Sequence, residues 1–363
     1  MAACRRVGVG LLLSLLSTAV VLGSVEIGFR LLAPQPTKAS VAVIPDLEMI
    51  YRLPANARGT DVKAEFAISI RTNGLGLRDR DYPPAKPPGA VRRILVLGDS
   101  MTFAEGVEAE ETYPKVLERA LEARHGRGRY EVINAAVRGY GNDQELMLFQ
   151  RLVPAYRPDV ALLAFFAVND PDDNVYGNLF ALDDGRLVRR ALSAESSPKY
   201  RYYVRQARIQ NFPGYAFAIR HSHALNWLRR RWALREFVRE FGVPGESRDA
   251  AGEEQAWQLT RAILTAWVDS ARREDIRPLL VLIPSPKQVV EGRDEPADGR
   301  AARVLALARE LRVNAFDPRP ALRAARAGAT PLYWPKDGHL TPRGHQVVAA
   351  FLEDRLTAVG VVP

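Results

Sequence analysis

Cysteine is nearly absent from this chain of 363 residues, which holds only Cys4. A single thiol forms no intramolecular disulfide and cannot build a cysteine-based metal site. Cys4 also precedes the apolar N-terminal segment, so it does not stand where a lipid-modified cysteine follows a signal sequence. The sequence contains no glycine-rich phosphate loop of either common spacing. We therefore expect no disulfide, no bound metal and no cofactor.

Lysine is scarce as well. Seven of the 51 basic residues are Lys, and the arginines are scattered rather than clustered. The formal net charge of +9 thus arises without the concentrated basic surface that nucleic-acid recognition requires. Charged residues make up 26% of the chain and hydrophobic residues 47%, which excludes a largely disordered protein and allows a large core. We predict a folded protein that does not bind nucleic acid.

Charge is missing altogether between Val7 and Val25, directly after Arg5 and Arg6. As a helix, these nineteen residues span about 28 Å, close to the thickness of the hydrocarbon layer. Basic residues that flank a membrane span stay in the cytoplasm, so residues 1–32 are predicted to form a cytoplasmic tip and a transmembrane anchor, with an extracytoplasmic (periplasmic) main domain. A cleaved signal peptide, which would release a secreted protein, is the alternative, although the apolar stretch is long and no Ala-x-Ala site closes it.

The remainder of the chain is typical of an α/β protein. Residues 33–91 are partly Pro-rich and predict a linker with small N-terminal elements. Over residues 92–363, short apolar runs alternate with amphipathic helical patterns, which indicates a parallel sheet covered on both faces. An interruption rich in Arg and aromatic residues, at about 175–250, predicts a helical insertion packed on the core; a lid, or a surface resting on anionic lipid or an acidic polymer, is the alternative. The apolar runs lie at 94–97, 130–137, 160–168, 278–284 and, more weakly, 313–317.

Polar residues follow the first three runs. Ser100 stands in "LGDSMTF", Gly139 in "VRGYG" and Asn169 in "AVND". In open parallel sheets, ligands bind at the carboxyl ends of the strands, so these residues are expected to meet at one edge. The Gly-Asp-Ser turn alone is ambiguous, because a Ser or Asp there can simply cap a helix.

A fourth polar block, "YWPKDGHLTPRGH", places Asp337 two residues before His339. A serine is a weak nucleophile and needs a base, which His339 supplies in this interpretation, while Asp337 holds the imidazole tautomer. The backbone N–H groups of Ser100 and Gly139 and the side-chain amide of Asn169 are candidate donors to an oxyanion. The predicted catalytic residues are therefore Ser100, His339 and Asp337, and the predicted oxyanion hole is formed by Ser100, Gly139 and Asn169.

These four blocks, in this order, resemble the SGNH/GDSL hydrolase superfamily over about residues 92–357. The resemblance implies a flavodoxin-like three-layer α/β/α sandwich with a central parallel sheet. It also implies an enzyme that acts on ester bonds through an acyl-enzyme and needs no cofactor.

The final block departs from the commonest family pattern, Asp-x-x-His, because Lys336 occupies the acid position and Asp337 supplies the carboxylate. This form is similar to the extracytoplasmic branch that contains the alginate-acetylation proteins. That similarity implies a substrate with O-acyl groups on carbohydrate, either hydrolysis or O-acyl transfer, and polysaccharide-biosynthesis partners. Asp317, at the end of the weak fifth run, is the alternative acid, since triads are defined by geometry.

Two further interpretations complete the prediction. A catalytically silent carbohydrate-binding or assembly protein of an envelope polysaccharide system is the alternative to an enzyme. The acidic stretch "NDPDDN" after the third run is interpreted as a solvated loop rather than a cation site, because it lacks a fixed ligand spacing.

Overall fold

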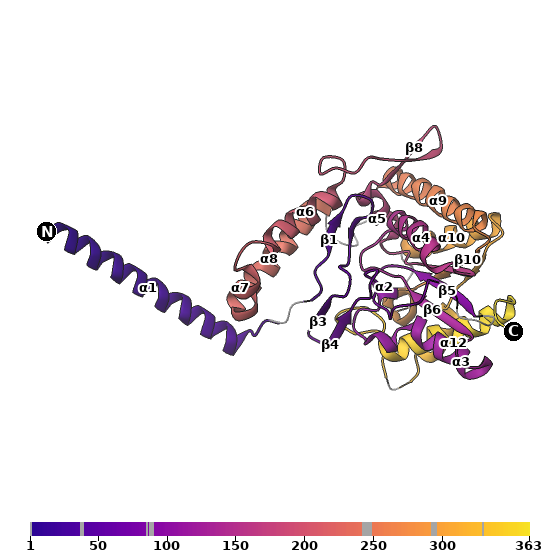
Figure 1. Cartoon of the computed structure of the whole chain (residues 1–363), viewed down its shortest axis with the longest axis horizontal. Coiled ribbons are helices and arrows are strands. Elements are labelled where there is room, and N and C mark those ends of the chain that lie inside the picture. The colour runs from indigo at the N-terminus through magenta and orange to yellow at the C-terminus, as the bar shows by residue number, and fades with distance from the viewer. Residues whose placement is uncertain are drawn as a thin grey trace.

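The N-terminal apolar segment forms one long helix that extends away from the rest of the molecule. A computed structural model describes residues 2–36, 40–84, 86, 91–241, 249–291, 296–328 and 330–363. Helix α1 (Ala2–Leu32) ends beside the main body, and the two chain termini lie at opposite ends of the structure (Figure 1). Its stretch Val7–Leu32 is long and apolar enough to cross a membrane. This makes α1 a candidate transmembrane span.

A central sheet of five parallel strands follows the five apolar runs, as the sequence predicts. Its strand order is β11-β10-β7-β5-β6. The runs are β-strands because their side chains are apolar on both faces, which suits a strand buried from both sides. The strands are β5 (Arg92–Leu97), β6 (Tyr130–Asn134), β7 (Val160–Phe165), β10 (Arg277–Leu282) and β11 (Asn314–Phe316).

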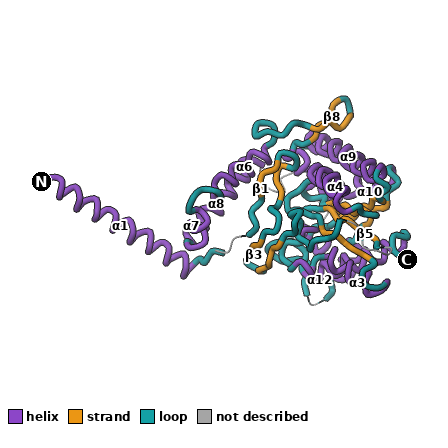
Figure 2. Tube along the Cα trace, in the orientation of Figure 1, coloured by secondary structure: helices purple, strands orange, loops and turns teal. Residues whose placement is uncertain are grey.

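Helices cover both faces of this sheet (Figure 2), so the predicted three-layer α/β/α architecture is confirmed. Alternate residues of a strand point to opposite faces. Accordingly Leu95 and Leu97 pack in one cluster with α4, α9 and α10, while Ile94 and Val96 pack in the other with α3, α11 and α12. The covering helices are α3 (Tyr113–His125), α4 (Asn142–Tyr156), α9 (Ala250–Arg273), α10 (Pro296–Glu310), α11 (Arg319–Ala325) and α12 (Pro342–Ala358).

The strand order places a topological switch point at the carboxyl end of β5. Strand β5 pairs with β6 on one side and with β7 on the other. The connections that leave β5 and β6 therefore run toward opposite sides of the sheet, and such a switch point is where ligands bind in open α/β sheets. The short helix α2 (Ser100–Phe103) begins there.

Two small hairpins precede the sheet, in the segment for which the sequence predicts a linker with small elements. Strands β1 (Ile44–Asp46) and β2 (Ile50–Arg52) pair antiparallel, as do β3 (Arg58–Val62) and β4 (Ala67–Arg71). Tyr51 is completely buried, so this segment contributes to the core instead of only connecting two parts.

The guanidinium of Arg78, just beyond β4, anchors the segment to the body. It donates to the backbone oxygens of Phe103 and Ala104, each at 2.8 Å, and of Val107 at 2.6 Å. These bonds fasten the turn that follows α2.

The insertion is helical, as predicted, but it forms an arm that leaves the main body. After α5 (Asp170–Gly177), a hairpin of β8 (Phe180–Asp183) and β9 (Arg186–Arg189) leads into α6 (Pro198–Gln210), α7 (Tyr215–His221) and α8 (His223–Phe241). Helix α6 packs on β1 and β2, whereas α8 contacts α1. The arm therefore connects the candidate membrane span to the body (Figure 1).

Candidate active site

The turn between β5 and α2 presents Ser100 without using it as a helix cap. A Cβ on Gly98 would lie 2.4 Å from Thr102 Oγ1, so only glycine fits this turn. Asp99 is the N-cap of α2, and its carboxylate accepts a hydrogen bond from the backbone N–H of Met101 at 2.9 Å. Because Asp99 caps the helix, the hydroxyl of Ser100 remains available to another partner.

That partner is His339, from the loop before α12. Ser100 Oγ lies 2.9 Å from His339 Nε2, and His339 Nδ1 lies 2.6 Å from Asp337 Oδ1. Gly338, with φ at +85°, adopts the left-handed conformation between the two polar residues. This turn lets an Asp-x-His spacing bring the carboxylate back to the imidazole. The structure thus brings Ser100, His339 and Asp337 together in one hydrogen-bonded chain.

Asp317 lies in a different environment. Its carboxylate pairs with the guanidinium of Arg319, with Oδ2 2.7 Å from Nη2. The carboxylate that orients His339 is therefore that of Asp337.

The charges around the triad make His339 a stronger base. Burial alone would lower the pKa of His339, but the hydrogen bond that His339 donates to Asp337 and the nearby carboxylate of Glu105 outweigh it and raise this pKa above its ordinary value. Burial would raise the pKa of Asp337, but hydrogen bonds from His339 and Lys63 lower it to about 2. Asp337 is therefore ionised over the whole physiological range.

The β3–β4 hairpin supplies two residues that the sequence interpretation missed. Lys63 Nζ lies 2.7 Å from Asp337 Oδ2 and 2.5 Å from Glu105 Oε2. Glu65 Oε2 accepts the backbone N–H groups of Lys336 at 2.9 Å and Asp337 at 2.8 Å. The hairpin therefore holds both the acid of the triad and the loop that carries it. No local pattern reveals this, because more than 270 residues separate the partners.

Two residues of the triad and Glu105 form the one candidate metal-binding group in the described ranges. Glu105, Asp337 and His339 offer ligand atoms within 4.8 Å of one another. Lys63 Nζ already bonds the two carboxylates. A lysine ammonium thus supplies the positive charge at this point.

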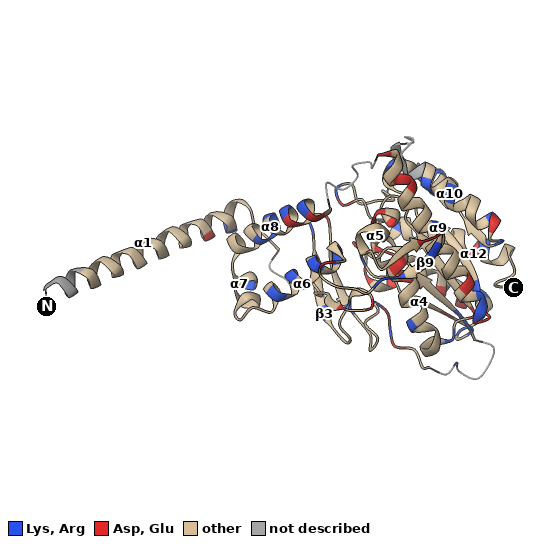
Figure 3. Ribbon diagram, turned by 90° about the horizontal axis from the view of Figure 1, so that it is seen from above, with Lys and Arg blue, Asp and Glu red and all other residues tan. Residues whose placement is uncertain are grey.

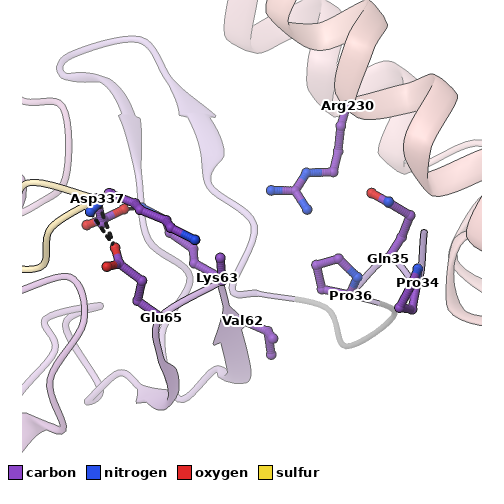
Figure 4. Close-up of a pocket in the computed structure, with 10 residues that line it drawn as sticks. Pro34, Gln35, Pro36, Val62, Lys63, Glu65, Arg230 and Asp337 are labelled. Atoms are coloured by element: carbon purple, nitrogen blue, oxygen red, sulfur yellow. Dashed lines mark hydrogen bonds and ion pairs between the residues drawn. The ribbon is translucent and has the colours of Figure 1, made fainter. Parts of the chain in front are cut away.

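A cavity of about 590 Å³ borders the acid side of the triad. Figure 4 shows Lys63 and Asp337 on one wall, with Arg230 of α8 projecting from the opposite side and Pro34 and Gln35 beside it. Part of α8 and the segment that follows α1 therefore lie next to the triad.

Gly139 lies in the loop beside the Ser100 turn. The backbone N–H of Val137 donates to Gly98 O at 3.0 Å, which places the end of β6 alongside this turn. Gly139 has a φ of +72°, and a Cβ there would lie 2.9 Å from Tyr51 Oη. Both the backbone conformation and the close approach of Tyr51 favour glycine.

Asn169 reaches the same place from the end of β7. Its Nδ2 lies 3.4 Å from Asp99 Oδ2 and donates to Asp173 Oδ2 at 2.9 Å. The sequence interpretation of 170–173 as a solvated loop is wrong, because Asp170 is completely buried in the first turn of α5. Its carboxylate accepts the backbone N–H of Phe166 at 2.9 Å. The acidic stretch thus fixes the strand end that carries Asn169.

Comparison with known families identifies one match. Residues 96–347 match the model of the GDSL-like Lipase/Acylhydrolase family. Comparison with curated proteins gives no match.

Several solved structures are similar to this chain at low identity. A variant of Axe2, an acetyl xylan esterase from Geobacillus stearothermophilus, is 13% identical, with 75% of this chain and 96% of that chain covered and a TM-score of 0.44. LAE5, an alpha/beta hydrolase enzyme from the metagenome of Lake Arreo, is 15% identical, with 75% and 97% covered and a TM-score of 0.44. The psychrotrophic esterase EstA from Pseudoalteromonas sp. is 14% identical, with 75% and 100% covered and a TM-score of 0.41.

The family match spans more than half of the chain and includes the four sequence blocks. This protein therefore belongs to the GDSL-like lipase/acylhydrolase family, the SGNH/GDSL hydrolases, and that membership supports an ester-hydrolysing enzyme.

Proposed function

We propose that this protein is a membrane-anchored, extracytoplasmic serine esterase or O-acyltransferase that acts on O-acyl groups of carbohydrate. The observation that carries the catalytic part is the hydrogen-bonded chain from Ser100 through His339 to Asp337 at the switch point of the sheet. The membrane part rests on the apolar stretch of α1.

In the proposed first step, Ser100 attacks the ester carbonyl while His339 Nε2 accepts the hydroxyl proton. Asp337 stays ionised and stabilises the imidazolium that forms. Backbone N–H groups at Ser100 and Gly139 donate to the oxyanion. Asn169 is the third donor, and its amide must exchange part of its bonding to Asp173 for the oxyanion. Each such donor contributes about 3–4 kcal/mol to lowering the barrier.

Collapse of the tetrahedral intermediate expels the alcohol, which takes its proton from His339 and leaves an acyl group on Ser100. In the second step His339 activates either water or a sugar hydroxyl, and the same atoms reverse their roles. Water is present at about 55 M, but a bound and aligned hydroxyl reaches an effective molarity of about 10⁵ M or more. Transfer therefore requires a place that seats the acceptor.

A second cavity, of about 500 Å³, is suited to that task. Arg138 lines it on the side of the body, next to Gly139, and Tyr203, Arg220, Arg229 and Arg230 line it on the side of the arm. Four guanidinium groups in one cavity favour an anionic ligand. This supports an acidic polysaccharide as the acceptor.

The nucleophile is tested by labelling with a fluorophosphonate. The label should map to Ser100, and Ser100→Ala should lose both labelling and turnover of a short-chain ester with an unchanged circular dichroism spectrum. Ser69→Ala, at an exposed position of β4, is the matched control and should keep both. A label on another residue would disprove the assignment, and a folded protein without label or turnover would favour the silent binding protein.

The choice between hydrolysis and transfer is tested by mass spectrometry of the products. As an acidic glycan is titrated in, acylated sugar should increase relative to free acid. The double change Arg220→Gln and Arg229→Gln should reduce that share, whereas Arg309→Gln on the exposed surface of α10 should not. Free acid alone across neutral and acidic glycans would leave a plain esterase.

The topology is tested with a reporter fused after Pro363. It should be active outside the cytoplasm, and the mature protein should begin at or near Met1. A mature N-terminus beyond residue 19 would indicate a cleaved signal peptide and remove the anchor.

A further inference from the structure

The last turns of α1 are hydrogen bonded to the start of α8. Glu26 accepts hydrogen bonds from Ser222 Oγ at 2.8 Å and from the backbone N–H groups of His223 at 2.9 Å and Ala224 at 3.1 Å. A carboxylate at a helix N-terminus satisfies the free N–H groups and complements the helix dipole. Arg30 Nη2 also donates to His221 O at 2.7 Å.

This junction coincides with the end of the uncharged stretch of α1. Glu26 is the first charged residue after Val25. In Figure 3 most of α1 carries neither charge colour, whereas Lys and Arg recur along α8 and α6. If α1 crosses the membrane, Glu26 stands at its surface and α8 begins at that level. Figure 1 shows α7 and α8 beside the last turns of α1.

The arm exposes large apolar side chains at this level. Leu225, Leu228 and Trp232 follow one another at i, i+3 and i+7 on α8, so they lie on one face of the helix. Leu228 is 58% exposed, and Phe212, which precedes α7, and Phe217, within α7, are each 70% exposed. Several large apolar side chains exposed on neighbouring helices mark a contact surface.

Arginines accompany these apolar residues. Arg235 and Arg239 continue the same face of α8, three and seven residues beyond Trp232. Arg231 lies over the ring of Trp227 at 5.2 Å from its centroid, and that ring lies 5.4 Å from the ring of Phe29 in α1. Aromatic and aliphatic side chains next to arginines are typical of helices that lie in the interface of an anionic membrane.

We propose that α7 and α8 form a membrane platform: Phe212, Phe217, Leu228 and Trp232 enter the boundary between headgroups and acyl chains, and Arg235 and Arg239 bind anionic lipid phosphates. This inference rests on the proposed anchoring by α1 and adds a second, interfacial contact. The occupant is a bilayer with anionic lipid. With α1 across the membrane and α7 and α8 on its surface, the active site is held at a fixed distance from the bilayer. The arginine-lined cavity then opens close to the membrane surface.

The test measures depth in the bilayer with nitroxide labels on the full-length chain in a Cys4→Ser background. Single cysteines are introduced as Leu228→Cys and, independently, Phe217→Cys, both at exposed positions. Leu16→Cys reports on α1, and Glu110→Cys, whose side chain is 80% exposed on the body, is the aqueous control. The protein is placed in discs of phosphatidylcholine alone or of an equimolar mixture with phosphatidylglycerol.

In the mixed discs, labels at 228 and 217 should be more accessible to oxygen than to a water-soluble nickel complex. The label at 16 should show the same preference. The label at 110 should show the opposite one, with greater accessibility to the nickel complex. Arg235→Gln with Arg239→Gln should reduce this difference at 228, and Arg309→Gln should not. Labels at 228 and 217 that behave like 110, while 16 stays in lipid, would refute the platform and leave the anchor. A label at 228 shielded from both reagents would indicate a protein contact instead, and an aqueous label at 16 would refute the anchor and the platform together.

Discussion

Replacing Lys63 by Met tests whether the β3–β4 hairpin acts on the chemistry. The change removes the only atom that bonds Asp337 Oδ2 and Glu105 Oε2 at once among the described residues, at 2.7 and 2.5 Å. The Met side chain keeps much of the apolar stem, so the packing of the hairpin should persist. What is lost is one positive charge between two carboxylates.

The magnitude follows from the burial of the partners. The side chains of Asp337 and Glu105 are each 11% exposed, and that of Lys63 is 32% exposed. Hydrogen bonds to charged groups contribute about 1.5–3 kcal/mol, and the partial exposure of Lys63 places this case at the lower end. Because about 1.4 kcal/mol corresponds to a tenfold change in rate, kcat/KM should fall about tenfold at neutral pH.

The sign of the pH effect is also determined. Lys63 lowers the pKa of His339, whereas Glu105 and Asp337 raise it. Removing Lys63 therefore raises the pKa of His339 further. The base must be neutral to accept the proton, so the acid limb of the kcat/KM profile should move to higher pH, and the loss should be smallest in alkaline buffer.

The assay is the pH profile of kcat/KM on a short-chain ester, with thermal unfolding as a check on the fold. Lys63→Arg keeps the charge and should leave the acid limb in place. Lys336→Met, at an exposed position of the loop that carries Asp337 and His339, is the control without a side-chain bond to the triad. An acid limb that stays in place in Lys63→Met, or moves to lower pH, would show that Lys63 has only a structural role.

Three other predictions concern the triad and the oxyanion loop. Asp337→Asn should reduce kcat by about 10⁴ while Asp317→Asn stays close to wild type, and steady-state kinetics that rank them in the opposite order would move the acid to Asp317. Gly139→Ala should lower kcat and cost about 1–3 kcal/mol in unfolding free energy, because it forces a side chain into a left-handed conformation against Tyr51; adding Tyr51→Phe should recover part of the loss, and no recovery would contradict the close approach. In the wild type, kcat/KM should fall with decreasing pH through a pKa above that of an ordinary histidine, since the raised pKa of His339 keeps the base protonated there; a rate that stays flat down to about pH 5, where even an ordinary histidine is largely protonated, would contradict this.

The sequence by itself determined the central sheet and the polar residues that stand at the ends of its strands. Five apolar runs of strand length, separated by helical periodicity, admit few arrangements other than a parallel sheet covered on both faces. Parallel strands bring their carboxyl ends to one edge, so Ser100, Gly139 and Asn169 were expected to meet there. His339 and Asp337 were also expected at the site, because a serine needs a base and the two lie close in sequence. All of these inferences use contacts within a few residues or a regular repeat.

Tertiary structure alone decided what surrounds this site. Lys63 and Glu65 come from a hairpin whose contact with the His339 loop depends on the packing of distant segments, and no local period encodes such a contact. The burial of Asp170 was misjudged for the same reason, since acidic composition indicates solvent until a specific donor, here the backbone N–H of Phe166, compensates for the loss of water. The arm is helical by its own sequence, but its junction with α1 through Glu26 forms only when two segments almost 200 residues apart meet in space.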